Sequence, residues 1–320
     1  MKAMLAPERR PILITGLICV LLYFAAGQMF DNFMTVRVFL DFFSNNAFLG
    51  VIAIGLTLVI ITGGIDLSVG SMAGCTSIMS AVLVTKQGLP SPVAFAIALV
   101  FGVAIGAGQG FLIARYQLAP FLVTLGGLFF CRGIGLLISR EQSPISDPLV
   151  NFLSAPAFSL GKGNVSWTAI LFVLTAIMMS IVLRQTRFGR TLFAIGGNAN
   201  SAHLMGLAVE KSLIKVYALS GFFGAFGGIL FAIYTASGNA TGGTGLELDA
   251  IAAIVIGGTL LTGGFGSILG TVLGILTIAI IQTAIIFQGN LSSWWNKIVI
   301  GALLLIFVLL QRTLAGKAAK

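Results

Sequence analysis

Long apolar stretches recur along the whole chain, and they constrain its fold more than any other feature of the sequence. Ten of them can be delimited, at about residues 11–30, 45–62, 68–85, 91–114, 120–138, 165–183, 213–234, 250–262, 268–287 and 297–311. A helix needs roughly 20 apolar residues to cross the hydrocarbon layer of a membrane. Charged residues make up only 8% of the chain, against about a quarter in soluble domains. We therefore predict an all-α polytopic membrane protein with about ten transmembrane helices, built as one transmembrane domain over residues 1–320.

The lysine and arginine residues indicate how these spans are oriented. Of the 18 Lys and Arg residues, twelve fall in loops on the side of the N-terminus, five fall on the opposite side, and Arg132 lies within a span. Positively charged loops remain in the cytoplasm, so we predict a bacterial inner-membrane protein with both termini cytoplasmic. This orientation accounts for the net charge of +9. We expect the lipid bilayer, and no nucleic acid, as a partner.

Two of the predicted connections leave a choice of topology. The turns between the second and third spans and between the eighth and ninth spans are short and uncharged, so either pair could be re-entrant. The tripeptide TGG occurs in both turns, at 62–64 and 262–264, and four flanking residues, among them Gly70 and Gly74, match the residue two hundred positions on. The match indicates either a duplicated helix–break–helix unit, as many transporters contain, or a coincidence among glycines.

Glycine and proline shape two further regions. The fourth span carries Gly102, Gly106 and Gly110 at four-residue spacing, which makes a smooth stripe where another helix can approach closely. The loop at 139–164 contains three prolines, and we expect it to be irregular.

A polar stretch at about 184–212 lies between two clear spans, on the side predicted to be cytoplasmic. It begins with three arginines and contains the only histidine of the chain, His203. Its middle, NANSAHLMGL, is typical of a short amphipathic helix that one of its Asn or Ser residues could cap, with Met205 on the apolar edge. A membrane protein without a soluble domain must meet its partners through such a loop, so we predict that another protein binds here.

Acidic residues interrupt two of the apolar stretches. In TGGIDLSVGS, Asp66 or Ser68 caps the third span, or Asp66 belongs to a discontinuous helix and faces a polar pathway, and both can be true. The same choice applies to LELDAIAAIVIGGTLLTGG, where Asp249 would cap the eighth span and Glu247 would lie one turn earlier at the outer mouth.

Arg132 lies well inside the fifth span. An arginine at the centre of a membrane costs roughly 2.5–3.5 kcal/mol on insertion scales. Three outcomes are open: the side chain extends to the outer interface, it pairs with an acid such as Asp66 or Glu247, or it lines the pathway.

Several chemistries have no motif in this sequence. The chain contains no GxxxxGK[ST] loop for ATP, no GxSxG, no HExxH and no cluster of Cys and His with metal-ligand spacing. Cys19, Cys75 and Cys131 fall in apolar stretches, and we expect them to pack without a disulfide. We therefore predict that the chain is not an enzyme and binds no cofactor or metal. Its few intramembrane charges also disfavour a proton- or sodium-driven carrier.

Three long motifs resemble the signatures of one family in their order along the chain. The segments TLVIITGGIDLSVGS (57–71), RFGRTLFAIGGNANSAHLMGL (187–207) and LELDAIAAIVIGGTLLTGG (246–264) look like those of the ribose/galactose-type ABC sugar permeases. The resemblance covers essentially the whole chain. LSSWWNKIVIGALLLIFVLLQR (291–312), NAFLGVIAIGLTLVI (46–60) and CRGIGLLISREQSPI (131–145) look most like the galactofuranose permease branch.

The resemblance implies a function and a set of partners. The chain would be the permease subunit of an ATP-binding-cassette importer for a monosaccharide, galactofuranose in the narrower branch. A separate ATPase subunit would use ATP, a second permease subunit, homologous or identical, would complete the channel, and a periplasmic sugar-binding protein would deliver substrate. ATP-driven movement of the short helix would tilt the sixth and seventh spans and so produce alternating access.

The resemblance also assigns residues. The loop at 184–212 would be the coupling loop that receives the ATPase, and its candidate contact residues are Gly189, Gly196, Gly197, Asn198, His203, Met205 and Gly206. Asp66, Arg132, Glu247 and Asp249 are the pathway candidates. Two other classes are weighed beside this one: a secondary sugar transporter or channel that works alone, and a membrane receptor or scaffold. The coupling-loop motif argues against both.

Overall fold

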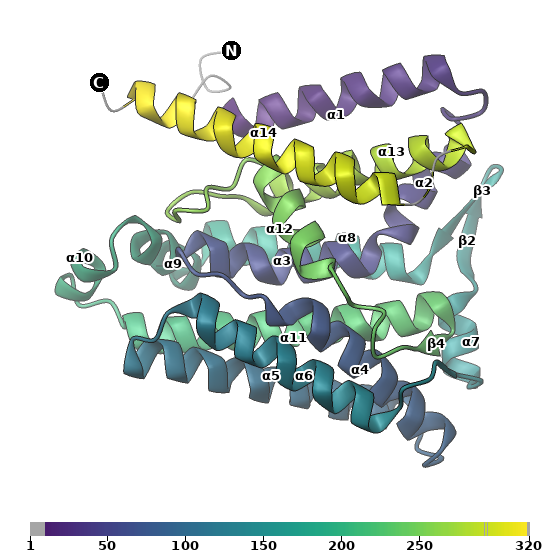
Figure 1. Cartoon of the computed structure of the whole chain (residues 1–320), viewed down its shortest axis with the longest axis horizontal. Helices are drawn as coiled ribbons and strands as arrows, with labels where there is room; N and C mark the ends of the chain where they lie inside the picture. Colours follow the sequence, from purple (N-terminus) through teal and green to yellow (C-terminus); the bar gives the residue numbers. More distant parts are fainter. Residues whose placement is uncertain (1–9, 291, 293, 319–320) are drawn as a thin grey trace.

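The computed structural model describes residues 10–290, 292 and 294–318, and apolar helices form most of it (Figure 1). Lys2, Arg9 and Lys320, which contribute to the predicted orientation, lie outside the described residues. Each of the ten predicted stretches contains a helix: α1 (Arg10–Met29), α3 (Ala47–Ile61), α4 (Ser68–Thr85), α5 (Ser91–Tyr116), α6 (Pro120–Ile138), α8 (Trp167–Gln185), α11 (Val209–Thr235), α12 (Leu246–Ile256), α13 (Ile268–Gln288) and α14 (Trp294–Ala318).

Seven helices within the described residues are long and apolar enough to cross a membrane on their own. The amphipathic helix α2 (Val36–Asn45) and helix α3 form a bent pair, with 53° between them, that makes an eighth candidate crossing. The prediction of an all-α polytopic membrane protein is therefore confirmed.

The predicted eighth span, 250–262, is wrong in its bounds and in its nature. Helix α12 has only 11 residues, ends at Ile256, and is followed by non-helical chain up to Ser267. At 1.5 Å per residue, such a helix is about 16 Å long, roughly half the thickness of the hydrocarbon layer. Helix α12 therefore cannot span the membrane alone.

A turn-rich, non-helical segment preceding α12 continues this crossing. Residues 239–245 run along α4, where the Ser77 hydroxyl donates to the carbonyl of Asn239 at 3.1 Å and accepts from its N–H at 3.2 Å. Deeper in the bundle, the backbone of Gly243 contacts the backbone of Gly70. Non-helical backbone at membrane depth is tolerated where protein buries it and satisfies its polar groups, and α4 provides both.

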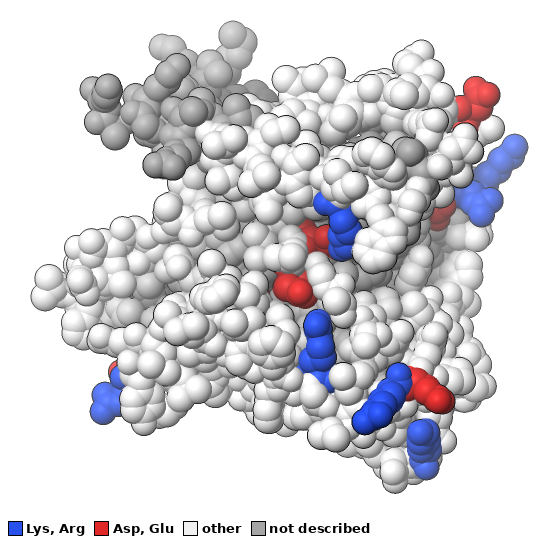
Figure 2. Space-filling view, viewed as in Figure 1, with Lys and Arg blue, Asp and Glu red and all other residues white. Residues whose placement is uncertain are grey.

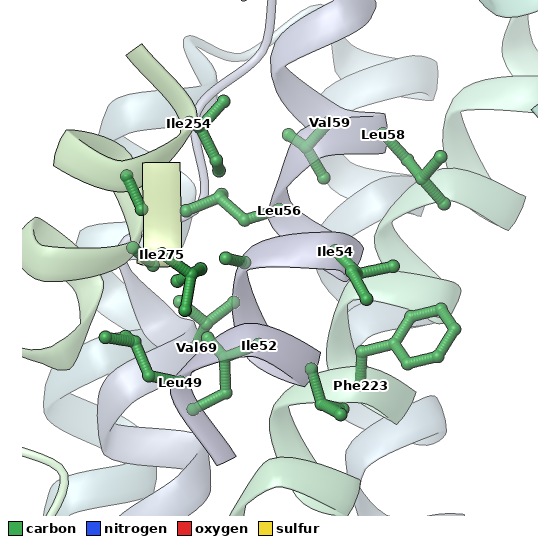
Figure 3. Close-up of a cluster of buried hydrophobic side chains, with 14 of the residues drawn as sticks. Leu49, Ile52, Ile54, Leu56, Leu58, Val59, Val69, Phe223, Ile254 and Ile275 are labelled. Atoms are coloured by element: carbon green, nitrogen blue, oxygen red, sulfur yellow. The ribbon is translucent and has the colours of Figure 1, made fainter. Parts of the chain in front are cut away.

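Helix α3 forms the centre of the molecule. Fourteen of its 15 residues are buried. Ile54 and Leu58 point to one side of the helix, and Leu56 points to the opposite side, toward Ile254 (Figure 3). Because lipid tails are as apolar as these side chains, close van der Waals packing and not transfer from water holds such a helix in place. An apolar sequence on all faces is the pattern of a helix surrounded by protein.

The predicted glycine stripe on α5 is confirmed as a packing surface, and its partner is α11. A Cβ at Gly102 would lie 2.5 Å from the carbonyl oxygen of Gly221, and one at Gly110 would lie 2.9 Å from the Cα of Ile214. Because both obstacles are backbone atoms, larger residues would force the helices apart.

The segment 139–164 is structured, so the prediction of an irregular loop is wrong. It contains β1 (Ser143–Pro144), α7 (Pro148–Ser154), β2 (Pro156–Leu160) and the start of β3 (Gly163–Ser166). Strand β1 pairs with β4 (Ser237–Gly238), and β2 pairs with β3 in a hairpin. These elements and α2 lie together at one end of the helix bundle (Figure 1).

The opposite end of the bundle carries α9 (Arg187–Gly197) and α10 (Ala199–Leu204). The first turn of α1 and the last turn of α14 also lie toward this end (Figure 1). This arrangement agrees with an even number of crossings between the two ends of the chain.

Candidate functional site

The polar loop at 184–212 folds into two consecutive short helices. Thr186 begins α9 by accepting a hydrogen bond from the N–H of Gly189 at 3.2 Å, and Asn198 begins α10 by accepting from the N–H of Ser201 at 2.8 Å. The predicted amphipathic helix in NANSAHLMGL is therefore confirmed, with Asn198 as its cap. Helix α9, which precedes it, was not predicted.

The tip of this loop is exposed. Gly197, Asn198, His203 and Gly206 are all exposed, and Met205 is 68% accessible. Leu204 beside it is 86% accessible. Apolar side chains held on a projecting helix beside polar ones form a surface that a protein partner can cover.

Gly189 and Gly196 of the same loop face inward. The Cα of Gly189 lies against the backbone of Leu183 at the end of α8. Gly196 is packed against two backbone atoms, the carbonyl oxygen of Ile61 and the nitrogen of Gly264. The loop residues proposed from the sequence thus fall into an exposed set and an internal set.

Two chain breaks with the sequence TGG meet beside Gly196. The N–H of Gly264 donates a hydrogen bond to the carbonyl of Ile61 at 2.9 Å, across the two breaks. Gly63 and Gly263 occupy corresponding positions and both have left-handed backbone conformations, with φ of 80° and 84°, which favour glycine. Helices α4 and α13, which follow the breaks, begin two hundred residues apart, in agreement with a repeated helix–break–helix unit.

Asp66 follows the first break and is only 1% exposed. Its carboxylate accepts from the N–H of Ser68 at 2.9 Å and from the hydroxyl of Ser220 on α11 at 2.7 Å. The Ser68 hydroxyl also donates to it at 2.6 Å. A buried carboxylate with three donors is well satisfied, so Asp66 holds the first turn of α4 against α11. The contact with Ser220 had no signal in the sequence.

Glu247 and Asp249 lie within the first turn of α12, which begins after Gly245. The prediction that Asp249 caps this helix is wrong, because Gly245, with φ of 86°, occupies the capping position. Asp249 instead accepts a hydrogen bond from Lys297 of α14 at 2.6 Å. The Glu247 side chain is 8% exposed and contacts Gly70 of α4, and its Oε2 has no hydrogen-bond partner among the described residues.

Arg132 is half-buried in α6. Within the part of the chain that the structure describes, it forms no ion pair with Asp66 or Glu247, and its Nε and one terminal nitrogen are buried without a partner. Of the three outcomes left open for Arg132, pairing with one of those acids is therefore excluded. Gln109 of α5 likewise has a buried amide nitrogen with no partner among the described residues.

Charged side chains gather near the middle of one face of the helix bundle. Figure 2 shows acidic and basic groups close together there, whereas other charges in this view lie toward the edges. Helices α6, α12 and α14 run through this region in Figure 1, and they carry Arg132, Glu247, Asp249 and Lys297. We refer to these four residues as the charged face.

The described residues contain no group of three or more His, Cys, Asp or Glu side chains that could hold a metal ion. The three cysteines are buried and free. What the chain offers is a helix bundle with broken crossings, a charged face within it and an exposed loop at one end. These features are typical of a multi-pass membrane transport protein with an exposed loop at one end.

The chain belongs to the family described as branched-chain amino acid transport system / permease component, whose model matches residues 38–308. It is 45% identical over 305 residues to the inner membrane ABC transporter permease protein YjfF of Escherichia coli, covering 95% of this chain and 92% of that protein. It is 34% identical over 317 residues to the ribose import permease protein RbsC of Escherichia coli, covering 97% and 95% of the two chains. No solved structure matches the chain.

Membership of this family, with the relatives above, confirms the predicted resemblance to ribose-type ABC sugar permeases. The protein is a multi-pass permease subunit of an ATP-binding-cassette importer, and it is not an enzyme. ATP hydrolysis belongs to a separate ATPase subunit, and a substrate-binding protein is the other implied partner.

Proposed function

We propose that this permease imports a monosaccharide, galactofuranose, by alternating access, with the ATPase docked on its coupling loop at 184–212. Two relatives support a sugar by their names: the ribose permease above, and the fructose import permease protein FruG of Bifidobacterium longum, 34% identical over 94% of this chain and 90% of that protein. The narrower choice of galactofuranose rests on the resemblance of segments 46–60, 131–145 and 291–312 to that branch.

The exposed part of the coupling loop is the proposed ATPase contact. Gly197, Asn198, His203, Met205 and Gly206 lie at its tip, where no part of the described chain covers them. The projecting pair of short helices gives a partner both an apolar contact and free polar groups. These properties support docking of a rigid subunit that moves when it binds ATP.

The distribution of charge supports a cytoplasmic position for this loop. Arg184, Arg187, Arg190 and Lys211 are exposed at or beside it. Both described ends of the chain lie toward the same end of the bundle (Figure 1). Since basic loops remain in the cytoplasm, we propose that both termini are cytoplasmic and that the β2–β3 hairpin faces the periplasm.

The charged face supports a second permease subunit as a partner. Lys297 is 49% exposed on its side chain although its partner Asp249 is buried, and Arg132 is half-buried on the same face. A charge that faces lipid costs roughly 2.5–3.5 kcal/mol on insertion scales. Another protein chain that encloses a polar cavity would remove this cost. We therefore propose that a second permease subunit, homologous or identical, covers the charged face.

The charged face would then line the sugar pathway between the two subunits. Glu247 and Arg132 keep buried polar atoms without partners among the described residues, and the hydroxyl groups of a sugar can both donate to a carboxylate and accept from a guanidinium. Asp249 would contribute to the lining of the pathway as the buried partner of Lys297. Asp66, whose carboxylate is fully satisfied, would support the pathway as a structural residue at the break.

Reconstitution tests this function. The protein is co-purified with the products of neighbouring genes and placed in liposomes with the ATPase and a binding protein loaded with galactofuranose, ribose or a branched-chain amino acid. Uptake of galactofuranose that requires ATP, from a complex with two permease chains, is expected. Uptake of ribose alone would contradict the narrower substrate, and uptake without ATPase or binding protein would instead identify a stand-alone secondary transporter.

A further inference from the structure

Three segments from distant parts of the chain meet where α9 ends. Gly196 contacts the carbonyl oxygen of Ile61, which is the last residue of α3, and the backbone nitrogen of Gly264, which lies in the break between α12 and α13. The last two atoms are joined by the hydrogen bond of 2.9 Å. We call these three residues the break joint.

The break joint is formed by backbone, and this makes it close and stiff. Gly196 and Gly264 have no side chain, and Ile61 takes part through its carbonyl group. A Cβ on Gly196 would collide with both neighbouring backbone atoms. Since backbone atoms cannot move aside as the end of a flexible side chain can, a displacement of Gly196 toward Ile61 and Gly264 must displace both breaks or separate them.

Each break lies next to a helix that carries a charged residue of the bundle or is held by one. The break at 62–67 contains Asp66, which anchors α4 to α11 through Ser220. The break at 257–267 follows α12, whose first turn carries Glu247 and Asp249. The break joint is therefore the point at which the coupling loop touches the elements that carry the charged and polar groups inside the bundle.

We propose that the break joint transmits movement of the coupling loop to both broken crossings at once, and that Gly196 is the positioning residue through which this occurs. This inference rests on the proposed docking of the ATPase on the loop. It differs from a mechanism in which the loop acts only by tilting α8 and α11, the two helices that flank it. In the tilting mechanism, contact between Gly196 and the breaks is incidental.

The chain provides a control in α5, outside the coupling loop. Gly108 is exposed, and a Cβ added to it would meet nothing within 4 Å. Gly196→Ala and Gly108→Ala thus add the same methyl group to a helical glycine, and only the first would collide with the break joint. A third variant, Gly197→Trp, places a bulky group on the exposed tip of the coupling loop and is directed at ATPase docking.

The test measures three quantities on the reconstituted importer: ATPase bound after purification, ATP hydrolysed, and sugar taken up per ATP. Gly196→Ala is expected to keep the ATPase bound and hydrolysing while uptake per ATP falls at least tenfold. Uptake per ATP in Gly108→Ala is expected to stay within twofold of the value for the unmodified protein. Gly197→Trp is expected to lose the bound ATPase, which identifies a docking defect and separates the two roles.

Three results would overturn the proposal in different ways. If sugar uptake per ATP in Gly196→Ala stays within twofold of the value for the unmodified protein, the result would favour the mechanism in which the loop tilts the flanking helices. Loss of the ATPase from Gly196→Ala would assign this residue to docking. Failure of the unmodified complex to couple uptake to ATP would instead contradict the proposed function.

A measurement on the unmodified complex covers the case in which Gly196→Ala does not fold. Amide hydrogen exchange at Gly264 is compared between the nucleotide-free complex and one held with ATP by a hydrolysis-deficient ATPase. If the break joint transmits the movement, the rate of hydrogen exchange at the Gly264 amide should change at least tenfold. This amide reports on the joint because its N–H donates a hydrogen bond to the carbonyl of Ile61. Peptides from the α5–α11 contact serve as the reference that should not change, and equal exchange at Gly264 in both states would refute the proposal.

Discussion

Replacing Lys297 by Met tests whether the ion pair on the charged face stabilises the fold. The substitution keeps most of the side-chain volume and leaves Asp249 buried without its partner. Breaking a fully buried pair costs about 3–5 kcal/mol, and an exposed pair contributes about 0–1 kcal/mol. Here 9% of the Asp249 side chain and 49% of the Lys297 side chain are exposed, so we expect an intermediate loss of about 2 kcal/mol.

The double variant Asp249→Asn with Lys297→Met is the internal comparison. It removes both charges, so no uncompensated carboxylate remains in the bundle. We expect it to recover at least half of the loss seen in Lys297→Met alone. Recovery in the double variant is the sign of a direct interaction between the two residues.

The buried cysteines supply the assay. Cys75 and Cys131 are 0% exposed and Cys19 is 8% exposed, so a thiol-reactive fluorescent dye labels them only as the bundle opens. Heating the purified protein in detergent at one fixed scan rate gives an apparent Tm. A loss of about 2 kcal/mol should lower it by roughly 4 °C for a chain of this size. An unchanged Tm in Lys297→Met, with no difference in the double variant, would refute the reasoning.

Four other predictions concern the bundle, the coupling loop, the pathway and the buried Asp66. Gly106→Leu should reduce the yield of folded protein, since its Cβ would collide with the backbone of α11, whereas Gly108→Leu, with nothing within 4 Å of its Cβ, should not; size-exclusion chromatography compares the two. Met205→Asp should abolish ATPase binding and uptake while membrane insertion is unchanged, and normal uptake would remove this residue from the docking surface. Arg132→Ala should lower uptake at least fivefold with the complex intact, and unchanged uptake would instead indicate that the side chain only extends to the interface. Asp66→Ala should lower the apparent Tm by several degrees more than Asp66→Asn, because the amide keeps an oxygen acceptor for its donors.

Periodic and compositional signals predicted the long helices well. Continuous apolar runs located every helix of the bundle, because membrane helices satisfy their own backbone. The stripe from Gly102 to Gly110 predicted a close helix contact, since spacing alone places these residues on one face. The sequence could not identify α11 as the partner, because that depends on the arrangement of the whole bundle.

Contacts between distant segments were the main source of error. The pairing of β1 with β4 joins Ser143 to Gly238, and nothing near 143 indicates a partner almost a hundred residues away. The β2–β3 hairpin did have a local signal in SLGKG, where Gly161 has a positive φ of 61°. Three prolines in the same loop obscured it.

In the candidate site, too, local features could be predicted from the sequence, and contacts between distant segments could not. Local sequence limited the cap of α10 to a few Asn and Ser residues, and the structure shows that Asn198 is the one. The bond from Lys297 to Asp249 and the contact of Gly196 with Ile61 and Gly264 join segments that are far apart in the chain. Such pairs have no local pattern, so the charged face and the break joint emerge only from the fold.

The turn-rich segment before α12 also has a consequence for how the protein is made. A helix of 11 residues, preceded by the non-helical residues 239–245, cannot leave an aqueous channel for lipid by itself. It becomes stable in the bilayer only when Ser77 and the glycines of α4, synthesised more than 150 residues earlier, are already in place to receive it. The last quarter of the chain must therefore assemble onto helices made earlier, and α4 must still be accessible on one side when synthesis of α11 is complete.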